Sequence, residues 1–217
     1  MDGDASDLKA RTLKIIRLLE KAHPDAKIAL TYSNPLELLV ATMLSAQCTD
    51  QKVNEVTKSL FRKYREAKDY ARADLETLQK EIRPTGFYRN KAKNIKKTCQ
   101  MLVDRFGSEV PKTMDELLML PGVARKTANI VLSNGYGVTA GIAVDTHVGR
   151  LTKRLGLTKN EDPEKIEKDL MEIVPKEQWT RFTDLLISHG RRVCTAKKPN
   201  CNGCVLADIC PSAFAFG

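Results

Sequence analysis

The sequence predicts an all-α protein, and three observations lead to that prediction. Residues 7–22 carry apolar side chains at the three- and four-residue spacing of an amphipathic helix. Asn34-Pro35 and Asp162-Pro163 each precede a segment with a helical pattern, and such pairs are typical of a helix start, because Asn and Asp cap the first turn and proline fits within it. Almost no segment shows the two-residue alternation of a β-strand.

The remaining elements are also helical in pattern. Residues 113–116 (Thr-Met-Asp-Glu) have the form of a capping box. Residues 164–174 are predicted as a helix that stops before Pro175, and residues 176–190 as another that ends at Gly190. With 217 residues, the chain is long enough for one compact unit or two small ones.

Residues 117–128 have the form of two helices joined by a tight turn. Leucines close the first helix, residues 121–124 (Pro-Gly-Val-Ala) make the turn, and Arg125 restarts a helix. Such a turn leaves backbone N–H groups unpaired at the second helix start, where they can hold a phosphate without reading any base. We interpret this segment as a helix-hairpin-helix; an ordinary connector between helices is the alternative.

Lys126 follows this turn, and Asp145 lies nineteen residues further on. A lysine has an ordinary pKa of roughly 10.4, so a nucleophilic lysine needs desolvation or nearby positive charge to lose its proton. The neighbouring Arg125 points about 100° away on a helix and does not assure that charge. The alternatives are a solvated surface lysine, since the chain holds 36 Lys and Arg, and a helix N-cap at Asp145.

Four of the six cysteines gather near the C-terminus. Cys194, Cys201, Cys204 and Cys210 are separated by six, two and five residues, which predicts one metal centre. Disulfides are disfavoured because the chain shows no secretion signal and is long enough to bury a core without them. A zinc ion and an iron–sulfur cluster both accept four thiolates, and the spacing alone leaves both open.

The charge of the chain favours a nucleic-acid partner. The net charge is +9 and the pI is near 9.3, although a generally basic protein would give the same values. Two groups are placed to grip phosphates, with a solvated surface as the alternative for each. They are a helical face, Arg89, Lys93, Lys96 and Lys97, and a loop pair, Lys197 and Lys198.

The sequence offers little sign of a membrane or of further catalytic groups. The longest apolar run, LELLVATML, is too short to span a bilayer, and the N-terminus lacks a signal pattern, so we expect an intracellular, cytoplasmic protein. His23 and His189 are predicted to be structural, His147 has no evident partner as an acid or base, and Trp179 is predicted to pack.

Several motifs together resemble the endonuclease III family of helix-hairpin-helix DNA glycosylases. They are LPGVARKTANIVL with VDTHVGR, MLSAQCTDQKV near residues 43–53, GFYRNKAKNI near 86–95, and the cysteine array, so the resemblance covers nearly the whole chain. It implies a six-helix barrel domain over residues 28–140, an iron–sulfur domain from residues 1–27 and 141–217, and a DNA cleft between them. It also implies a 4Fe-4S cluster on the four cysteines.

The resemblance implies roles for individual residues. Lys126 would attack the sugar and Asp145 would stabilise its developing positive charge. Gln47 and Phe87 would fill the space of an extruded base; Phe87 replaces the more usual leucine, and a buried core phenylalanine is its alternative. Asp50 would support the active site or the start of a helix. Further DNA contacts are expected from Arg89, Lys91, Gly122, Ala124, Thr127, Lys197 and Lys198. Ala124 stands where many relatives have glycine, so we expect ordinary helical dihedral angles there.

The implied activity is that of a bifunctional glycosylase and abasic-site lyase. It would remove oxidised or ring-saturated pyrimidines from damaged double-stranded DNA, as a monomer associated with a prokaryotic nucleoid. Adenine-removing relatives carry an acid near position 41, where this chain has Ala41, and relatives that act on thymine mismatches replace the lysine. A monofunctional mismatch glycosylase and a redox-sensing iron–sulfur protein that binds DNA without catalysis remain the alternatives.

Overall fold

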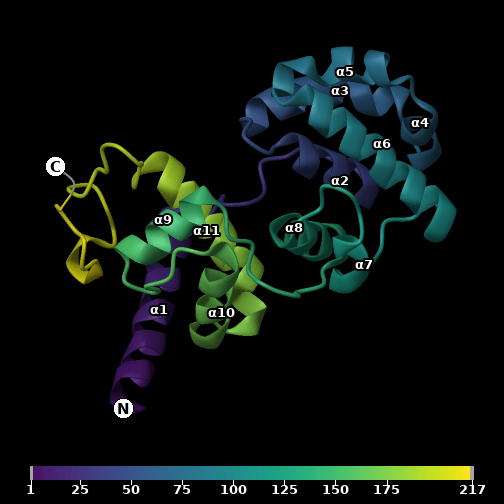
Figure 1. The fold of residues 1–217 in the computed structure, drawn as a ribbon. Helices are drawn as coiled ribbons and strands as arrows, with labels where there is room; N and C mark the ends of the chain where they lie inside the picture. Colours follow the sequence, from purple (N-terminus) through teal and green to yellow (C-terminus); the bar gives the residue numbers. More distant parts are fainter. Residues whose placement is uncertain (1, 216–217) are drawn as a thin grey trace. The chain divides into compact units, whose positions relative to one another are not determined.

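The computed structural model describes residues 2–215, with side chains from residue 6 onward, and this part of the chain is all helical (Figure 1). The longer elements are α1 (Asp2–Ala22), α2 (Pro35–Leu44), α3 (Asp50–Lys63), α5 (Leu75–Ile82), α6 (Tyr88–Arg105), α8 (Arg125–Tyr136), α9 (Thr146–Arg154), α10 (Pro163–Ile173) and α11 (Trp179–Arg192). The short elements are α4 (Ala67–Arg72), η1 (Arg83–Thr85), α7 (Met114–Leu118), η2 (Lys176–Gln178) and η3 (Ala207–Ile209). None of the described helices is long and apolar enough to cross a membrane.

The chain divides into two compact units. The hairpin unit is the continuous segment Ala29–Ala140, and the cluster unit combines Met1–Ile28 with Gly141–Gly217. The first unit contains the hairpin, and the second contains the four clustered cysteines.

The hairpin unit is built around α2. Its residues from Leu38 to Leu44 are all buried, which fits a helix that is covered on every side. α2 packs on α8, α3 and α6, and α6 in turn packs on α4 and α5. The Asn34 side chain caps α2 by accepting a 2.9 Å bond from the Glu37 N–H, as the sequence predicts for the Asn-Pro pair.

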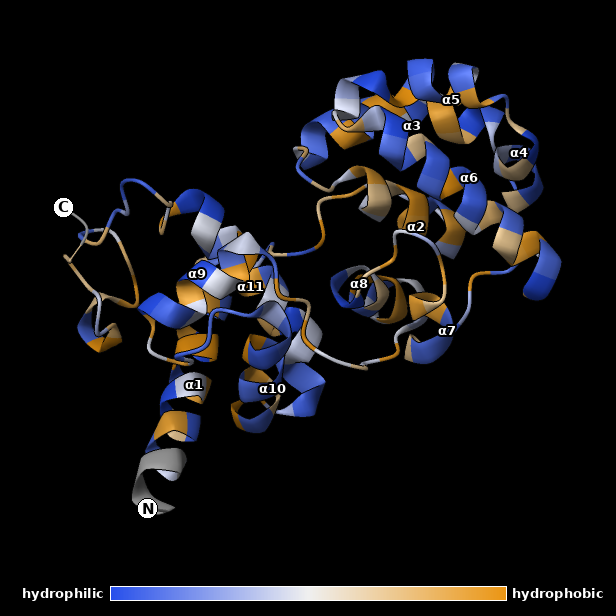
Figure 2. Ribbon diagram, viewed as in Figure 1, coloured by the Kyte–Doolittle hydropathy of each residue, from blue (hydrophilic) through white to orange (hydrophobic). Residues whose placement is uncertain are grey.

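The cluster unit joins the two ends of the chain. α1 packs on α10 and α11, and α9 packs on α11, around a core that includes Leu19, Val148, Leu170 and Phe182. Hydropathy colouring shows apolar segments recurring between hydrophilic ones along α1 (Figure 2). Nη1 of Arg11 also donates to the Leu155 carbonyl at 2.6 Å, which ties α1 to the end of α9.

Two capped helix starts are predicted correctly, whereas the bounds of α1 and α11 differ from the prediction. The side chain of Asp162 caps α10, and Thr113 caps α7, as expected. α1 begins at Asp2 rather than at residue 7, and α11 continues to Arg192, two residues beyond the predicted end at Gly190. Glycine weakens a helix by only about 1 kcal/mol, so Gly190 does not by itself end α11.

Candidate active site, loop hollow and cysteine cluster

The predicted hairpin is present in the hairpin unit. Leu117 of α7 is fully buried, and the Val123 N–H donates to the Leu120 carbonyl at 3.1 Å, which closes the turn. Gly122 has φ +78°, and a Cβ there would lie 2.7 Å from Nδ2 of Asn94. Both the left-handed backbone and the close approach to Asn94 require glycine at this position.

Ala124 is the N-cap residue of α8, with φ −96° and ψ 169°. The expected helical dihedral angles are therefore wrong: φ is negative, but the residue is extended, as N-cap residues usually are. Alanine has no side-chain acceptor, so no side chain caps the first turn of α8 at this position. The N–H groups of that turn are suited to an anion such as a phosphate.

Lys126 is the second residue of α8, and its side chain is exposed. Thr127 follows it and is partly buried. The lysine therefore lies directly beside the uncapped turn, on a rigid helix, with its ammonium group accessible to a ligand.

Asp145 belongs to the cluster unit and is the N-cap of α9. Its Oδ1 accepts bonds from the N–H groups of His147 and Val148, both at 2.8 Å. The N-cap alternative considered from the sequence is thus correct. Both cap bonds end on Oδ1, so Oδ2 of this partly buried carboxylate lies outside the cap.

The loops that carry Gln47 and Phe87 meet at one hollow of the hairpin unit. The hollow is open to solvent, and Gln47, Phe87, Lys91 and Gly122 are among the residues that line it. Gln47 and Phe87 have φ values of +52° and +46°, which are unusual for residues other than glycine. Phe87 is 64% exposed, which excludes the alternative of a buried core phenylalanine.

The structure corrects the expected role of Lys91. The residue is buried, and its Nζ donates to the carbonyls of Leu44 and Thr85, each at 2.7 Å. Burial also lowers the pKa of Lys91. The spacing of basic residues along a helix does not show which of them bind carbonyls of other segments. The ammonium of Lys91 is held inside the protein and is not available to a phosphate.

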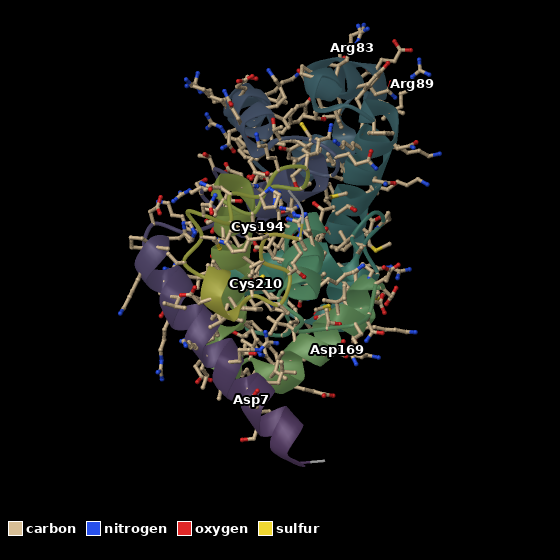
Figure 3. All side chains as sticks on the ribbon, turned by 90° about the vertical axis from the view of Figure 1, so that its left-hand side faces the viewer. Asp7, Arg83, Arg89, Asp169, Cys194 and Cys210 are labelled. Atoms are coloured by element: carbon tan, nitrogen blue, oxygen red, sulfur yellow. The ribbon has the colours of Figure 1, made fainter. Side chains whose placement is uncertain are left out.

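The basic face of α6 is correspondingly smaller than the sequence predicts. Nζ of Lys96 donates to the carbonyls of Ala71 and Ala73 at 2.7 and 2.6 Å, so this lysine is also committed to the protein. Arg89, Lys93 and Lys97 are exposed. Arg89 projects from the surface of the hairpin unit (Figure 3) and lies over the ring of Tyr88, 5.8 Å from its centroid.

Asp50 is the first residue of α3, directly after the N-cap residue Thr49. An acidic side chain in the first turn is favoured by the helix dipole. The helix-start role considered from the sequence therefore has structural support.

The four clustered cysteines line a second hollow, within the cluster unit. Cys194 and Cys210, labelled in Figure 3, come from the two ends of this segment. Among the described residues, no three His, Cys, Asp or Glu side chains are grouped closely enough to hold a single metal ion. Four thiols spread around such a hollow fit a cluster of several iron atoms better than one tetrahedral zinc ion.

Polar groups of the protein also approach the cysteine sulfurs. Nη1 of Arg154 donates to Sγ of Cys194 at 3.2 Å, and the Leu206 N–H donates to Sγ of Cys204 at 3.4 Å. Arg154 also donates to the carbonyls of Thr195 and Ala196, both at 2.9 Å. These bonds hold the loop that presents Lys197 and Lys198, whose side chains are exposed.

His189 makes two contacts that the sequence does not indicate. Its Nε2 lies 3.3 Å from Sγ of Cys204, and its Nδ1 lies 3.0 Å from Nε2 of His23. Burial lowers the pKa of His189 to about 4 and, with the charge of Arg192, lowers the pKa of His23, so both rings are neutral near pH 7. If Nε2 of His189 donates to the sulfur, Nδ1 must accept from His23. Nδ1 of His23 is then an acceptor only, and among the described residues it is buried without a hydrogen-bond partner.

The packing role predicted for Trp179 is confirmed, whereas His147 has a neighbour that the sequence did not reveal. Trp179 is buried, and its Nε1 donates to the Val174 carbonyl at 2.9 Å. His147 packs beside Arg150, whose Nη2 lies 3.2 Å from its Nδ1.

The fold and these sites define a class: all-helical proteins with a helix-hairpin-helix, an exposed lysine at the start of its second helix, and four cysteines that line one hollow. A model of the HhH-GPD superfamily of base excision DNA repair proteins matches residues 40–176. A model of the iron–sulfur binding domain of endonuclease III matches residues 194–210, which include all four clustered cysteines.

Individual relatives agree with these matches. Endonuclease III of Synechocystis sp. is 53% identical over 207 residues, 95% of this chain and 94% of the relative. Two solved structures, a non-covalent endonuclease III–DNA complex and a trapped endonuclease III–DNA covalent intermediate, each match with a TM-score of 0.91 and 48% identity. Each match covers 94% of this chain and 96% of the solved chain.

The chain belongs to the endonuclease III family within the HhH-GPD superfamily, and it is a bifunctional DNA glycosylase and abasic-site lyase of base excision repair with a 4Fe-4S cofactor. The all-α fold class, the family resemblance and the cofactor predicted from the sequence are confirmed. The alternatives of a zinc site, a monofunctional mismatch glycosylase and a non-catalytic redox sensor are not needed.

Proposed function

We propose that Lys126 is the nucleophile of both reactions and that Asp145 stabilises the charge that develops on the sugar. The observation that carries the proposal is the exposed Lys126 side chain beside the uncapped first turn of α8. A phosphate held by that turn would bring the neighbouring sugar within reach of the amine.

The proposed reaction begins when the damaged nucleotide leaves the base stack, because its sugar cannot be reached inside the duplex. The neutral amine of Lys126 forms a bond to C1′ while the C1′–N bond breaks, and the base leaves with the bonding electrons and takes up a proton. The ionised Asp145 stabilises the positive charge at C1′, as a carboxylate does in glycoside hydrolysis. Ring opening then gives an imine between Nζ and C1′.

The same imine accounts for strand cleavage. It acidifies the C2′ proton, and loss of that proton pushes electrons toward the C3′–O bond, which breaks and releases the 3′ phosphate. Asp145 is the proposed proton-transfer group, since Oδ2 lies outside the cap of α9 while Oδ1 keeps the carboxylate oriented. Water finally hydrolyses the imine and restores Lys126. The trapped covalent complex of a 48% identical endonuclease III with DNA supports such an intermediate on this chain.

We further propose that Gln47 and Phe87 enter the space that the extruded nucleotide leaves. Both side chains are exposed and line the same hollow as Gly122 of the hairpin. The backbone of Gly122, Ala124 and Thr127 would bind the phosphates near the lesion, and Arg89, Lys197 and Lys198 would bind more distant ones. Lys91 is left out of this set, because its ammonium is buried.

The proposal also covers the substrates, the roles of the two units and the setting in which the protein works. The substrates would be oxidised or ring-saturated pyrimidines, such as thymine glycol, in double-stranded DNA. The hairpin unit would act as the barrel domain and the cluster unit as the iron–sulfur domain, with damaged DNA bound by both. Asp50 would support the active site through α3. The protein would work as a monomer in the cytoplasm of a prokaryote, at the nucleoid.

The test compares wild-type protein with two variants on a duplex that contains one thymine glycol. Lys126→Gln should remove strand cleavage and lower base release by at least 1,000-fold, because the amine is lost while the helix is kept. Asp145→Asn keeps a capping oxygen and should slow base release by roughly 100-fold, in the range typical of a lost electrostatic stabiliser. Lys9→Gln, at an exposed position of α1, serves as the matched control. Full strand cleavage by folded, cluster-loaded Lys126→Gln would overturn the proposal.

A further inference from the structure

Lys91 is a buried cation that connects two loops of the hairpin unit. Its side chain is 7% exposed, and its Nζ donates to the carbonyls of Leu44 and Thr85 at 2.7 Å each. Removing an ammonium from water is unfavourable unless charge-assisted hydrogen bonds replace the lost hydration, and these two short bonds do so. The residue is thus placed where its loss would release both carbonyls.

Each of these carbonyls lies just before a residue in the left-handed backbone region. Leu44 is the last residue of α2, three positions before Gln47, and Thr85 is the last residue of η1, two positions before Phe87. The carbonyl of Leu44 lies at the C-terminus of its helix, where a positive charge is favoured by the helix dipole. One ammonium therefore bonds to the starts of both loops.

Gln47 and Phe87 hold conformations that do not arise from their own preferences. Their φ values of +52° and +46° are disfavoured for side chains with a Cβ. Such conformations persist where the surrounding structure fixes them, and they gather at functional sites. Both side chains are nevertheless exposed at one hollow, so contacts of their side chains with the core do not fix them.

We propose that Lys91 is a positioning residue, which fixes the two loops so that Gln47 and Phe87 stand together at the hollow before DNA arrives. The role of those two side chains in filling the space of the extruded nucleotide rests on the proposed function above. With both loops fixed in advance, less conformational freedom is lost on binding the distorted duplex.

Lys96 supplies a matched control on the same helix. Its Nζ also donates to two backbone carbonyls, those of Ala71 and Ala73, at 2.7 and 2.6 Å. These carbonyls lie at the end of α4, away from both loops in the sequence. Lys96→Met therefore removes the same kind of interaction from α6 without releasing the carbonyls before Gln47 and Phe87.

The first measurement is hydrogen exchange of the DNA-free, cluster-loaded protein. Lys91→Met should speed amide exchange at least tenfold in residues 45–49 and 85–88, whereas Lys96→Met should leave these segments unchanged and affect residues 71–74. Lys91→Arg, which keeps a charged donor, should restore part of the protection. Lys91→Gln serves the same comparison if Lys91→Met does not fold. Unchanged exchange in both loops of the Lys91 variants would overturn the proposal.

The second measurement detects extrusion separately from chemistry. In the Lys126→Gln background, the probe is a thymine glycol duplex with 2-aminopurine opposite the lesion, whose fluorescence rises when the base unstacks. Lys91→Met should reduce that rise severalfold, and Lys96→Met should not. If Lys91→Met speeds exchange in both loops but leaves the fluorescence rise unchanged, Lys91 fixes the loops without assisting extrusion, and only that part of the proposal is overturned. Failure of the proposed function would appear differently, as absence of strand cleavage by the protein with Lys126 intact.

Discussion

The two units of this protein are stabilised in different ways. The hairpin unit is one continuous segment whose helices bury a full set of apolar residues, as α2 does from Leu38 to Leu44. The cluster unit draws on both ends of the chain, and among its described residues from 194 to 215 only Leu206 is buried. A segment with so little apolar burial cannot fold by the hydrophobic effect alone. The comparison indicates that the iron–sulfur cluster takes the place of a core there.

The largest effect should follow removal of a cluster ligand. Cys201→Ser should lose the iron and leave residues 194–215 open to proteases, because metal binding supplies the folding free energy of such segments. The helices of the hairpin unit should remain protected. Iron content, visible absorbance and limited proteolysis with mass spectrometry give the readout, and Cys48→Ser, in the hairpin unit, is the matched control. Protease resistance of residues 194–215 in iron-free protein would show that the cluster does not take the place of a core in this segment.

A smaller effect is expected from the histidine pair of the cluster unit. His189→Phe keeps a ring but removes both the contact with Cys204 and the bond to His23. We expect a loss of about 1–3 kcal/mol in the free energy of unfolding, the usual cost of an unsatisfied buried polar group. Bleaching of the cluster by a chelator should become several times faster. His23→Phe leaves the contact with Cys204 in place and should bleach more slowly than His189→Phe; equal rates would show that the sulfur contact is unimportant.

An effect of similar size, but one that depends on pH, is expected from Asp184 of α11. Burial raises the pKa of Asp184 from 3.8 to about 6, partly opposed by the charge of Arg181. The folded state therefore binds the proton more tightly than the unfolded state. The resulting stabilisation is complete below about pH 4 and is lost as the pH rises through about 6.

Asp184→Asn tests this sign directly. The amide cannot ionise, so the variant should gain roughly 1–3 kcal/mol relative to wild type between pH 4 and pH 7.5, as expected for a shift of about two pKa units. Chemical denaturation of both proteins at pH 4 and pH 7.5 gives the stability difference between them at each pH. Any effect of the amide that does not depend on pH is the same at both values and cancels when one difference is subtracted from the other. A stability difference that does not change with pH would show that Asp184 titrates normally.

The sequence predicted features that depend on neighbouring residues. The hairpin, the caps at Asn34, Asp145 and Asp162, and the cysteine array all follow from short-range patterns, and the structure contains each of them. Helix caps and turns are local interactions, so the residues that make them lie close together in the sequence.

Features that depend on contacts between distant segments could not be predicted from short-range sequence patterns. Lys91 was expected to contact DNA, but its partner carbonyl at Leu44 lies 47 residues away. The bond between His23 and His189 joins positions 166 residues apart. The left-handed conformations of Gln47 and Phe87 had no glycine to indicate them. In each case the deciding partner, or the backbone constraint, is set by the tertiary fold.

Lys126 is the proposed site of the imine with DNA, and identification of the cross-linked amine tests this assignment. Wild-type protein is incubated with a thymine glycol duplex and borohydride, which reduces an imine to a stable amine, and the cross-linked peptide is identified by mass spectrometry after digestion. We expect the sugar remnant to be attached to Nζ of Lys126. Attachment to another amine, such as Lys91 or the N-terminus, would contradict the assignment of the nucleophile.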